Sequence, residues 1–234
     1  MTPQIFGWQH LTYDAVVIAL MVLGLIWIYR HVKSEKQARN MIRIIGIVLL
    51  ASILWNRISV CALRDGFQFF IPSSYCGVTS FSLALAAIFL KKNHPLFHAL
   101  VYIGFLGGLL TLIYPDFIVQ ADSIWYSMTI SGLLHHTIMV FLILLLFMTG
   151  YVTPSFKKWF ILPLGLALYI TLGVILITKF GYTDAMYIYE PALEGSMFDY
   201  LGLGALFLPV HAIFLWTWDH YLKHKLPVMS FSVK

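Results

Sequence analysis

The chain has 234 residues, of which 60% are hydrophobic and only 11% are charged. About a quarter of the residues of a soluble domain are charged, so this composition excludes a water-soluble globule and indicates that lipid surrounds most of the surface. The net charge of +5 does not indicate a nucleic-acid partner, because the basic residues lie in short segments between apolar stretches. We expect one transmembrane domain over residues 1–234,.

Seven apolar stretches are each about long enough to cross a bilayer as a helix, which takes roughly 20 residues. Polar or turn-rich joints separate them, and Pro95, Pro115 and Pro154 fall in these joints, where proline interrupts no helical hydrogen bond,. The sequence therefore predicts an all-α membrane bundle of seven transmembrane helices. The predicted spans are 12–30, 42–62, 74–90, 95–114, 124–148, 159–178 and 200–221.

Lysine and arginine alternate between the two sides of this predicted bundle. The first, third and fifth joints and the C-terminal tail hold 12 of the 15 basic residues, and the other side holds seven of the ten acidic residues. The positive-inside rule places the N-terminus outside and the C-terminus inside. We therefore expect a multi-pass protein of the cell membrane. The seven acidic residues are Asp65, Asp116, Asp122, Asp184, Glu190, Glu194 and Asp199; the basic residues include Lys234 at the C-terminus.

Ionisable side chains inside spans are costly to bury, so each is a candidate functional residue. At 1.5 Å per residue, Arg57 lies roughly 9 Å below the outer end of its span and His135 lies roughly 16 Å below the outer end of its own. His211 falls at a similar level, and Cys76 lies in the first turn of the third span. All four residues are therefore predicted to lie in the outer half of the bilayer.

A thiol and an imidazole at compatible depth suggest nucleophilic catalysis, because the thiolate is the reactive form and a neighbouring base produces it. The turn before Cys76 places it near a helix N-terminus, whose N–H groups stabilise negative charge. Arg57, with Asn56 beside it, would hold a lipid phosphate. Spacing alone leaves other interpretations open: Cys76 as a packing residue, a disulfide with Cys61, and histidines that only bridge helices.

Three segments, IPSSYCGVTSF (71–81), SGLLHHTIMVFL (131–142) and DAMYIYEPALEGSMFDYLG (184–202), carry a resemblance to a known family. They are similar to the bacterial YwaF-like integral membrane proteins, relatives of the animal transmembrane protein 164 acyltransferases. That family has a proline shortly before a cysteine that opens the third span, a histidine in the fifth span, and a Met-Tyr loop ending in Asp-x-x-Gly. The matching residues, within about 40–222, are Pro72, Cys76, His135, Met186, Tyr187, Asp199 and Gly202.

The resemblance implies an acyltransferase that acts on phospholipids within the membrane. Cys76 would accept a fatty acyl group from a phospholipid, His135 would take the thiol proton, and the acyl group would pass to a lysophospholipid. His136 is the alternative base, because consecutive helical residues point about 100° apart and only one can face Cys76. Some bacterial members have a histidine where this chain has Ser74, which cannot act as a base. No cofactor or metal is expected.

The aromatic and acidic loop 182–199 is long for a connection between helices,. One interpretation is a lid that places Tyr187 and Glu190 above Cys76 as substrate-binding residues. The other is an interfacial segment that fixes the last two spans. A transporter or permease that uses buried His, Arg and Asp is the main alternative function, although no internal repeat supports it. A membrane protein without catalysis is a further alternative.

Overall fold

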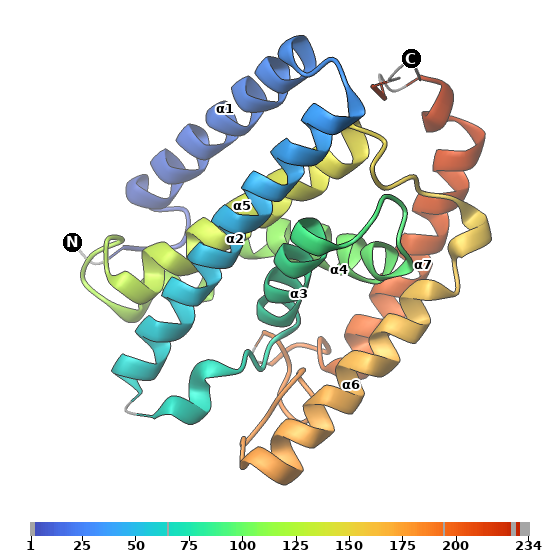
Figure 1. Ribbon diagram of the computed structural model, residues 1–234. Coiled ribbons are helices and arrows are strands. Elements are labelled where there is room, and N and C mark those ends of the chain that lie inside the picture. The colour runs from blue at the N-terminus through green and yellow to red at the C-terminus, as the bar shows by residue number, and fades with distance from the viewer. Residues whose placement is uncertain (1–2, 65, 194, 226–227, 230–234) are drawn as a thin grey trace.

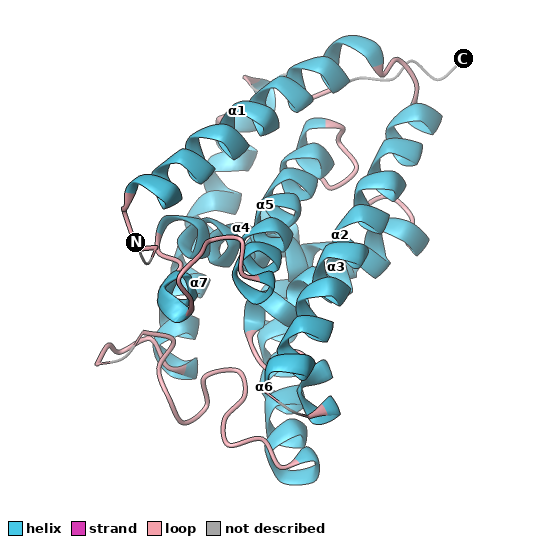
Figure 2. Cartoon of the chain, turned by 90° about the vertical axis from the view of Figure 1, so that its left-hand side faces the viewer, coloured by secondary structure: helices cyan, strands magenta, loops and turns pink. Residues whose placement is uncertain are grey.

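The computed structural model describes residues 3–64, 66–193, 195–225 and 228–229, and in this part of the chain seven α-helices form a bundle (Figure 1). Helices, short 3-10 turns and loops make up the described residues, without a strand (Figure 2). The helices are α1 (Trp8–His31), α2 (Glu35–Leu63), α3 (Tyr75–Phe89), α4 (Pro95–Ile113), α5 (Ser127–Met148), α6 (Ile161–Phe180) and α7 (Tyr200–His220). The 3-10 turns are Phe67–Phe70, Asp116–Gln120, Phe156–Lys158 and Leu222–His224.

Six of these helices are long and apolar enough to cross a membrane, and α3 is the exception. It has 15 residues, which corresponds to about 22 Å of helix against a hydrocarbon core of about 30 Å. The predicted all-α membrane bundle is confirmed in its helical class. The structure supports six spans by length, and the seventh span remains a prediction.

The start of α2 is the main difference between the predicted and observed helices. The joint was predicted over 31–40, but α2 begins at Glu35 after the N-cap residue Ser34, whose hydroxyl accepts the N–H of Gln37 at 3.2 Å. The helix extends beyond the predicted span because hydropathy detects the lipid-facing portion of a helix and not its polar extension; the bounds of the span itself stay a prediction. A capping residue followed by Glu and Lys forms a stable first turn outside the membrane.

The core of the bundle lies around α4 and α5. Helix α2 packs against α3 and α5, and α4 packs against α3, α5 and α6. More than half of the residues in the 18-residue apolar segments of α4 and α5 are buried inside the bundle, against 6% in the corresponding segment of α1. Leu142, Ile143 and Leu145 of α5 are fully buried. Helix α1 therefore lies at the periphery, where most of its apolar side chains face the surroundings of the bundle.

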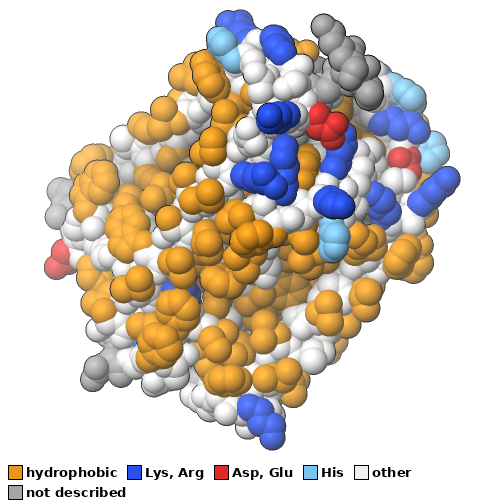
Figure 3. Space-filling model, in the orientation of Figure 1, with side chains coloured by type: hydrophobic (Ala, Val, Ile, Leu, Met, Phe, Trp, Pro, Cys, Tyr) orange, Lys and Arg blue, Asp and Glu red, His pale blue; other side chains and the backbone are white. Residues whose placement is uncertain are grey.

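Basic side chains gather at one end of the bundle, which we call the basic end (Figure 3). The guanidinium of Arg39 donates to the carbonyls of Ala87 at 3.0 Å and Ile88 at 3.1 Å, so it caps the last turn of α3. Residues 66–74 and 181–193 lie together at the opposite end (Figure 1). Five cations line one hollow at the basic end: Lys36, Arg39, Arg43, Lys91 and Lys92. Three residues of the predicted charge pattern, Asp65, Glu194 and Lys234, lie outside the described residues.

Candidate functional site

Cys76 is the second residue of α3, at the end of the bundle opposite the basic end. Ser74 is the N-cap: its hydroxyl accepts the N–H of Gly77 at 3.2 Å and its carbonyl accepts the N–H of Val78 at 3.1 Å. The N–H groups of Tyr75 and Cys76 have no backbone carbonyl partner among the described residues, as expected for the first turn of a helix,. Ser74 thus shapes the start of the helix that carries the thiol.

The Cys76 thiol points at α4. Its Sγ lies 3.9 Å from the Oγ1 of Thr111. The Thr111 hydroxyl itself donates to the carbonyl of Gly107 at 2.8 Å, so its oxygen is left to accept from the thiol,. A Cβ at Gly107 would lie only 2.7 Å from the sulfur. The missing side chain at Gly107 therefore makes the room in which the thiol sits.

The thiol lines a pocket of about 220 Å³ between α3, α4, α7 and the loop before α7. The walls are largely apolar, with Ile103, Leu110 and Phe207 among them, whereas Asp116 and Tyr187 are polar groups of the lining. Such a pocket suits an alkyl chain with a polar group at one end. The remaining lining residues are Tyr75, Gly107, Thr111, Tyr114, Ala192, Leu193, Phe198, Leu203 and Leu206.

The loop 181–199 is held over this pocket by backbone hydrogen bonds. The N–H of Met186 donates to the carbonyl of Ser73 at 2.7 Å, and the N–H of Tyr200 donates to the carbonyl of Tyr187 at 2.8 Å. Met186 and Tyr187 both have left-handed backbone conformations, with φ of 56° and 55°. Such conformations are unfavourable for side chains of this size, so the surrounding contacts must hold them in place.

Tyr187 is the residue of this loop that lines the pocket with a polar side chain, beside the apolar Ala192, Leu193 and Phe198. Burial raises the pKa of its phenol, and the nearby Cys76, Asp116 and Asp184 act in the same direction. The phenol therefore stays protonated at neutral pH and can donate a hydrogen bond to a carbonyl or phosphate oxygen. Glu190, which was predicted beside it, is exposed and does not line the pocket.

His135 lies on α5 and contacts α3 one turn away from Cys76. Its Nδ1 is 3.3 Å from the hydroxyl of Ser80, which follows Cys76 by four residues and so lies on the same side of α3,. The Ser80 hydroxyl also lies 3.2 Å from the sulfur of Met139 and donates to it. The serine oxygen then accepts from Nδ1–H, which leaves the Nε2 of His135 without a proton and able to act as a base.

His136 points to a different neighbour. Its Nδ1–H donates to the carbonyl of Gly132 at 2.7 Å, and its ring stacks near Phe117 with centroids 6.3 Å apart. The rings of His135 and His136 are 4.1 Å apart. Of the two, His135 is the one that hydrogen-bonds α3, through Ser80. No hydrogen bond joins the thiol to either imidazole within the described residues, so the role of each histidine remains a prediction.

Asn56 and Arg57 form a polar link between α2 and α5. The Oδ1 of Asn56 accepts from the guanidinium of Arg57 through Nε at 3.2 Å and through Nη2. Its Nδ2 donates to the hydroxyl of Ser131 at 3.1 Å and to the carbonyl of Met128 at 3.3 Å. Arg57 also interacts electrostatically with both histidines. Neither Asn56 nor Arg57 lines the Cys76 pocket, so a phosphate contact of Arg57 remains a prediction.

His211 lies apart from the Cys76 pocket, in a second cavity toward the basic end. The depth estimate put it level with His135, but depth along a helix does not say which side of the helix a residue faces. Thr111, Ser80 and Asp116 are the site residues that sequence reasoning missed. The sequence pair Gly107-Gly108 is the signal that could have pointed to the space for the thiol on α4. Gly107 makes this space, whereas Gly108 serves close helix packing, because a Cβ there would lie 2.7 Å from Val140.

Substitution of Gly107 by alanine is expected to displace the Cys76 thiol, because the new Cβ would lie 2.7 Å from the sulfur. We expect thiol-dependent activity to fall at least about tenfold while the bundle stays folded, since a displaced reactive group loses its alignment. Gly204→Ala is the matched control, because nothing lies within 4 Å of a Cβ at that position. If Gly107→Ala and Gly204→Ala had equal activity in the same turnover assay, the close contact between the Cys76 thiol and α4 at Gly107 would be contradicted.

The fold and the site define a multi-pass helical membrane protein with a cysteine at a helix start, facing an apolar pocket. The model of the TMEM164 family matches residues 5–218, so the chain belongs to this family. This confirms the predicted relation to the transmembrane protein 164 family. Searches of curated proteins and of solved structures found no match.

Proposed function

We propose that the protein is a membrane acyltransferase that moves a fatty acyl chain from a phospholipid to a lysophospholipid through an acyl-cysteine. The observation that carries this proposal is the position of the Cys76 thiol, at a helix N-terminus and in the wall of an apolar pocket. A thiol in this setting can attack an ester whose acyl chain lies in the pocket. Membership of the TMEM164 family supports the same conclusion.

In the first half-reaction, the Cys76 sulfur attacks the ester carbonyl while His135 Nε2 takes the thiol proton. The N–H groups of Tyr75 and Cys76 stabilise the oxyanion at the start of α3. Collapse of the tetrahedral intermediate breaks the ester bond, and the leaving alkoxide takes the proton from His135. The products are an acyl-cysteine and a lysophospholipid, with all charges balanced.

In the second half-reaction, the hydroxyl of an acceptor lysophospholipid attacks the thioester. His135 now removes the hydroxyl proton and returns it to the departing sulfur. The thiol faces Thr111 in the resting structure, so rotation of the Cys76 side chain must bring the sulfur away from Thr111 and toward His135. Catalytic hydrogen bonds are often formed only in the complex with substrate.

We also propose that α3 crosses the membrane as the seventh span, with the N-terminus outside, the C-terminus inside and the cell membrane as the location. Burial of Leu83, Ala84 and Ala87 supports this placement, because these side chains of α3 contact other helices and not lipid. A short buried helix does not need to match the full hydrocarbon thickness by itself. The Cys76 pocket then opens toward the outer leaflet.

The experiment that tests the function is an exchange assay with the purified full-length protein in lipid vesicles. Phospholipid with an isotopically labelled acyl chain and an unlabelled lysophospholipid are supplied, and the products are read by mass spectrometry. We expect label to appear in the acceptor. Release of labelled fatty acid would be consistent with an acyl-cysteine but would make water the acceptor in place of the lysophospholipid. Absence of any acyl transfer or release would refute the enzyme proposal.

A further inference from the structure

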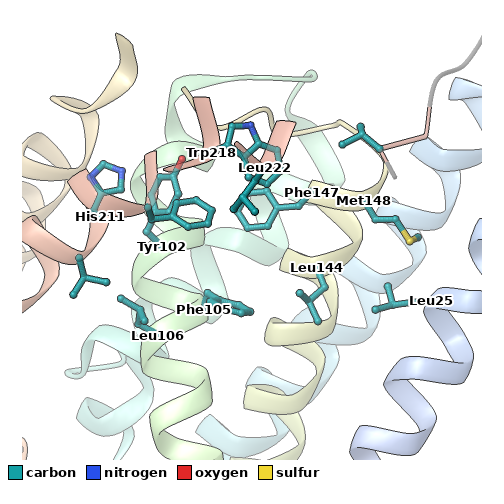
Figure 4. A pocket seen from close by; sticks show the side chains of 13 residues that line it. Leu25, Tyr102, Phe105, Leu106, Leu144, Phe147, Met148, His211, Trp218 and Leu222 are labelled. Atoms are coloured by element: carbon teal, nitrogen blue, oxygen red, sulfur yellow. The ribbon is translucent and has the colours of Figure 1, made fainter. Parts of the chain in front are cut away.

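The hollow at the basic end is an open space of about 490 Å³ between the start of α2, the end of α3 and the two lysines that follow α3. Figure 3 shows the Lys and Arg side chains gathered at this end. The hollow shares no lining residue with the Cys76 pocket or with the second cavity, whose wall is formed by apolar side chains such as Phe105 and Leu106 (Figure 4). The proposed acyl transfer therefore does not use it.

Arg39 is a fixed part of the wall of this hollow. Its guanidinium donates to two carbonyls at the end of α3 and to the hydroxyl of Tyr151. That hydroxyl in turn donates to the carbonyl of Leu90 at 2.8 Å. These bonds hold the positive charge of Arg39 in place against α3. The other cations of the lining are the ones that remain able to contact a ligand.

The charges around the hollow are not balanced by the acids that the structure describes. Glu35 is the acid of the lining, and its carboxylate lies 3.6 Å from the ammonium of Lys92. Lys36, Arg43 and Lys91 are exposed, and none of them forms an ion pair with a described carboxylate. The hollow therefore has a large excess of positive charge on side chains that are free to contact an anion.

Three of the cations also share one face of α2. Lys36, Arg39 and Arg43 are spaced by three and by four residues, and residues at these spacings are neighbours on a helix,. Arg43 acts electrostatically on Arg39 as a like charge. Like charges at this spacing destabilise a helix, so these cations stand where folding alone disfavours them. A bound anion would relieve the repulsion, which points to a negatively charged ligand.

Apolar side chains lie directly beside these cations. Phe89, the last residue of α3, lines the hollow and is 72% exposed. Ile47 follows Arg43 by four residues on the same face of α2 and is 55% exposed,. A soluble phosphate ion makes no use of such neighbours, whereas a phospholipid carries its alkyl chains next to its phosphate. The ligand that fits both kinds of side chain is therefore a lipid.

We propose that this hollow binds one anionic phospholipid of the leaflet at the basic end. Its phosphate lies among Lys36, Arg43 and Lys91, and its alkyl chains lie beside Phe89 and Ile47. Basic pockets between transmembrane helices bind anionic headgroups in this way. A zwitterionic lipid brings an ammonium group that the cations repel, so a headgroup with a net negative charge is preferred. This proposal does not depend on the chemistry of Cys76.

The test uses the full-length protein in detergent and a phosphatidylglycerol probe with a diazirine in one acyl chain, at physiological ionic strength. After photolysis, we expect labelled peptides from the start of α2 and the end of α3. Phosphatidylglycerol should displace the probe, and phosphatidylcholine should compete at least about tenfold more weakly. Glycerol 3-phosphate, which has the phosphate without alkyl chains, should compete at least about a hundredfold more weakly.

A double variant, Arg43→Gln with Lys91→Gln, removes two cations of the lining. Displacement by phosphatidylglycerol should weaken at least about tenfold, because each Lys or Arg near the membrane surface adds to the attraction of anionic lipid. Lys33→Gln with Lys157→Gln is the matched control, since it removes the same charge from exposed lysines that do not line the hollow. The control should change displacement less than about threefold.

The melting temperature reports whether each variant is folded. Equal weakening by the two double variants would reduce the hollow to the general attraction of the basic end and overturn the site. Equal competition by phosphatidylcholine would overturn the preference for an anionic headgroup, and equal competition by glycerol 3-phosphate would make this a site for soluble phosphate. Labelling confined to other helices would overturn the position of the lipid.

Discussion

Replacement of Cys76 by alanine is expected to abolish acyl transfer, with a loss of at least about a thousandfold, because covalent catalysis has no nucleophile without the sulfur. The change removes one sulfur atom, which lies beside Thr111 in the space left by the missing side chain of Gly107. Little else depends on it, so the variant should fold. Turnover is measured in the vesicle exchange assay, and folding is checked by the melting temperature.

The covalent intermediate gives a second readout of the same variant. With a donor phospholipid whose acyl chain is labelled, the natural protein should retain label that hydroxylamine releases, as expected for a thioester. Cys61→Ala is the matched control, since Cys61 is the other cysteine of the chain, is free, and lies on α2 with its sulfur 4.0 Å from the Phe67 carbonyl. Label retained by Cys76→Ala and lost from Cys61→Ala would move the nucleophile to Cys61.

The helices of this protein could be predicted well from sequence because apolar length dominates a membrane helix. The predicted spans over 95–114 and 200–221 differ by one residue from the observed α4 (Pro95–Ile113) and α7 (Tyr200–His220). The polar start of α2 could not be predicted from hydropathy, because it lies beyond the apolar segment. The capping signal at Ser34 was present in the sequence and would have extended the helix.

The site was harder to predict because sequence gives the depth of a residue but not the direction in which it points. His135 and His211 were assigned similar depths, yet His135 contacts α3 and His211 lines the second cavity. Thr111 and Asp116 carry no motif that marks them. Thr111 lines the Cys76 pocket from α4, which packs against α3, and Asp116 lines it from the 3-10 turn that follows α4. The resemblance supplied what periodicity could not, namely the loop that brings Tyr187 to the pocket.

The loop 182–199 has features of both interpretations, the interfacial segment and the lid. Its backbone is tied to Ser73 before α3 and to the start of α7, as an interfacial segment would be. Tyr187 nevertheless lines the pocket, as a lid residue would. Met186 is fully buried and both residues have positive φ. A fixed cover of this kind keeps the Tyr187 side chain in the pocket wall without a closing motion.

His135→Gln is expected to lower turnover by about 100-fold to 10,000-fold, the usual contribution of a general base. Gln preserves much of the volume of the imidazole and can still hydrogen-bond Ser80, so the effect should reach proton transfer more than packing. His136→Gln is the matched control, because the two residues are adjacent and almost equally buried, at 3% and 6% exposure. We expect His136→Gln to lower turnover less than about tenfold, since its ring points to Gly132 and Phe117.

The relative size of the two losses decides which imidazole takes the proton of the Cys76 thiol. Ser80→Ala tests whether the hydrogen bond from His135 to Ser80 sets the tautomer that this role requires. Without its hydroxyl, the Nδ1–H of His135 loses its acceptor, and the tautomer with a free Nε2 is no longer selected,. Ser80→Ala should therefore reduce turnover by about tenfold with substrate affinity unchanged, and Ser80→Thr should restore part of the rate. A larger loss in His136→Gln than in His135→Gln would transfer the base to His136. Full activity of both histidine variants would require a proton acceptor outside α5.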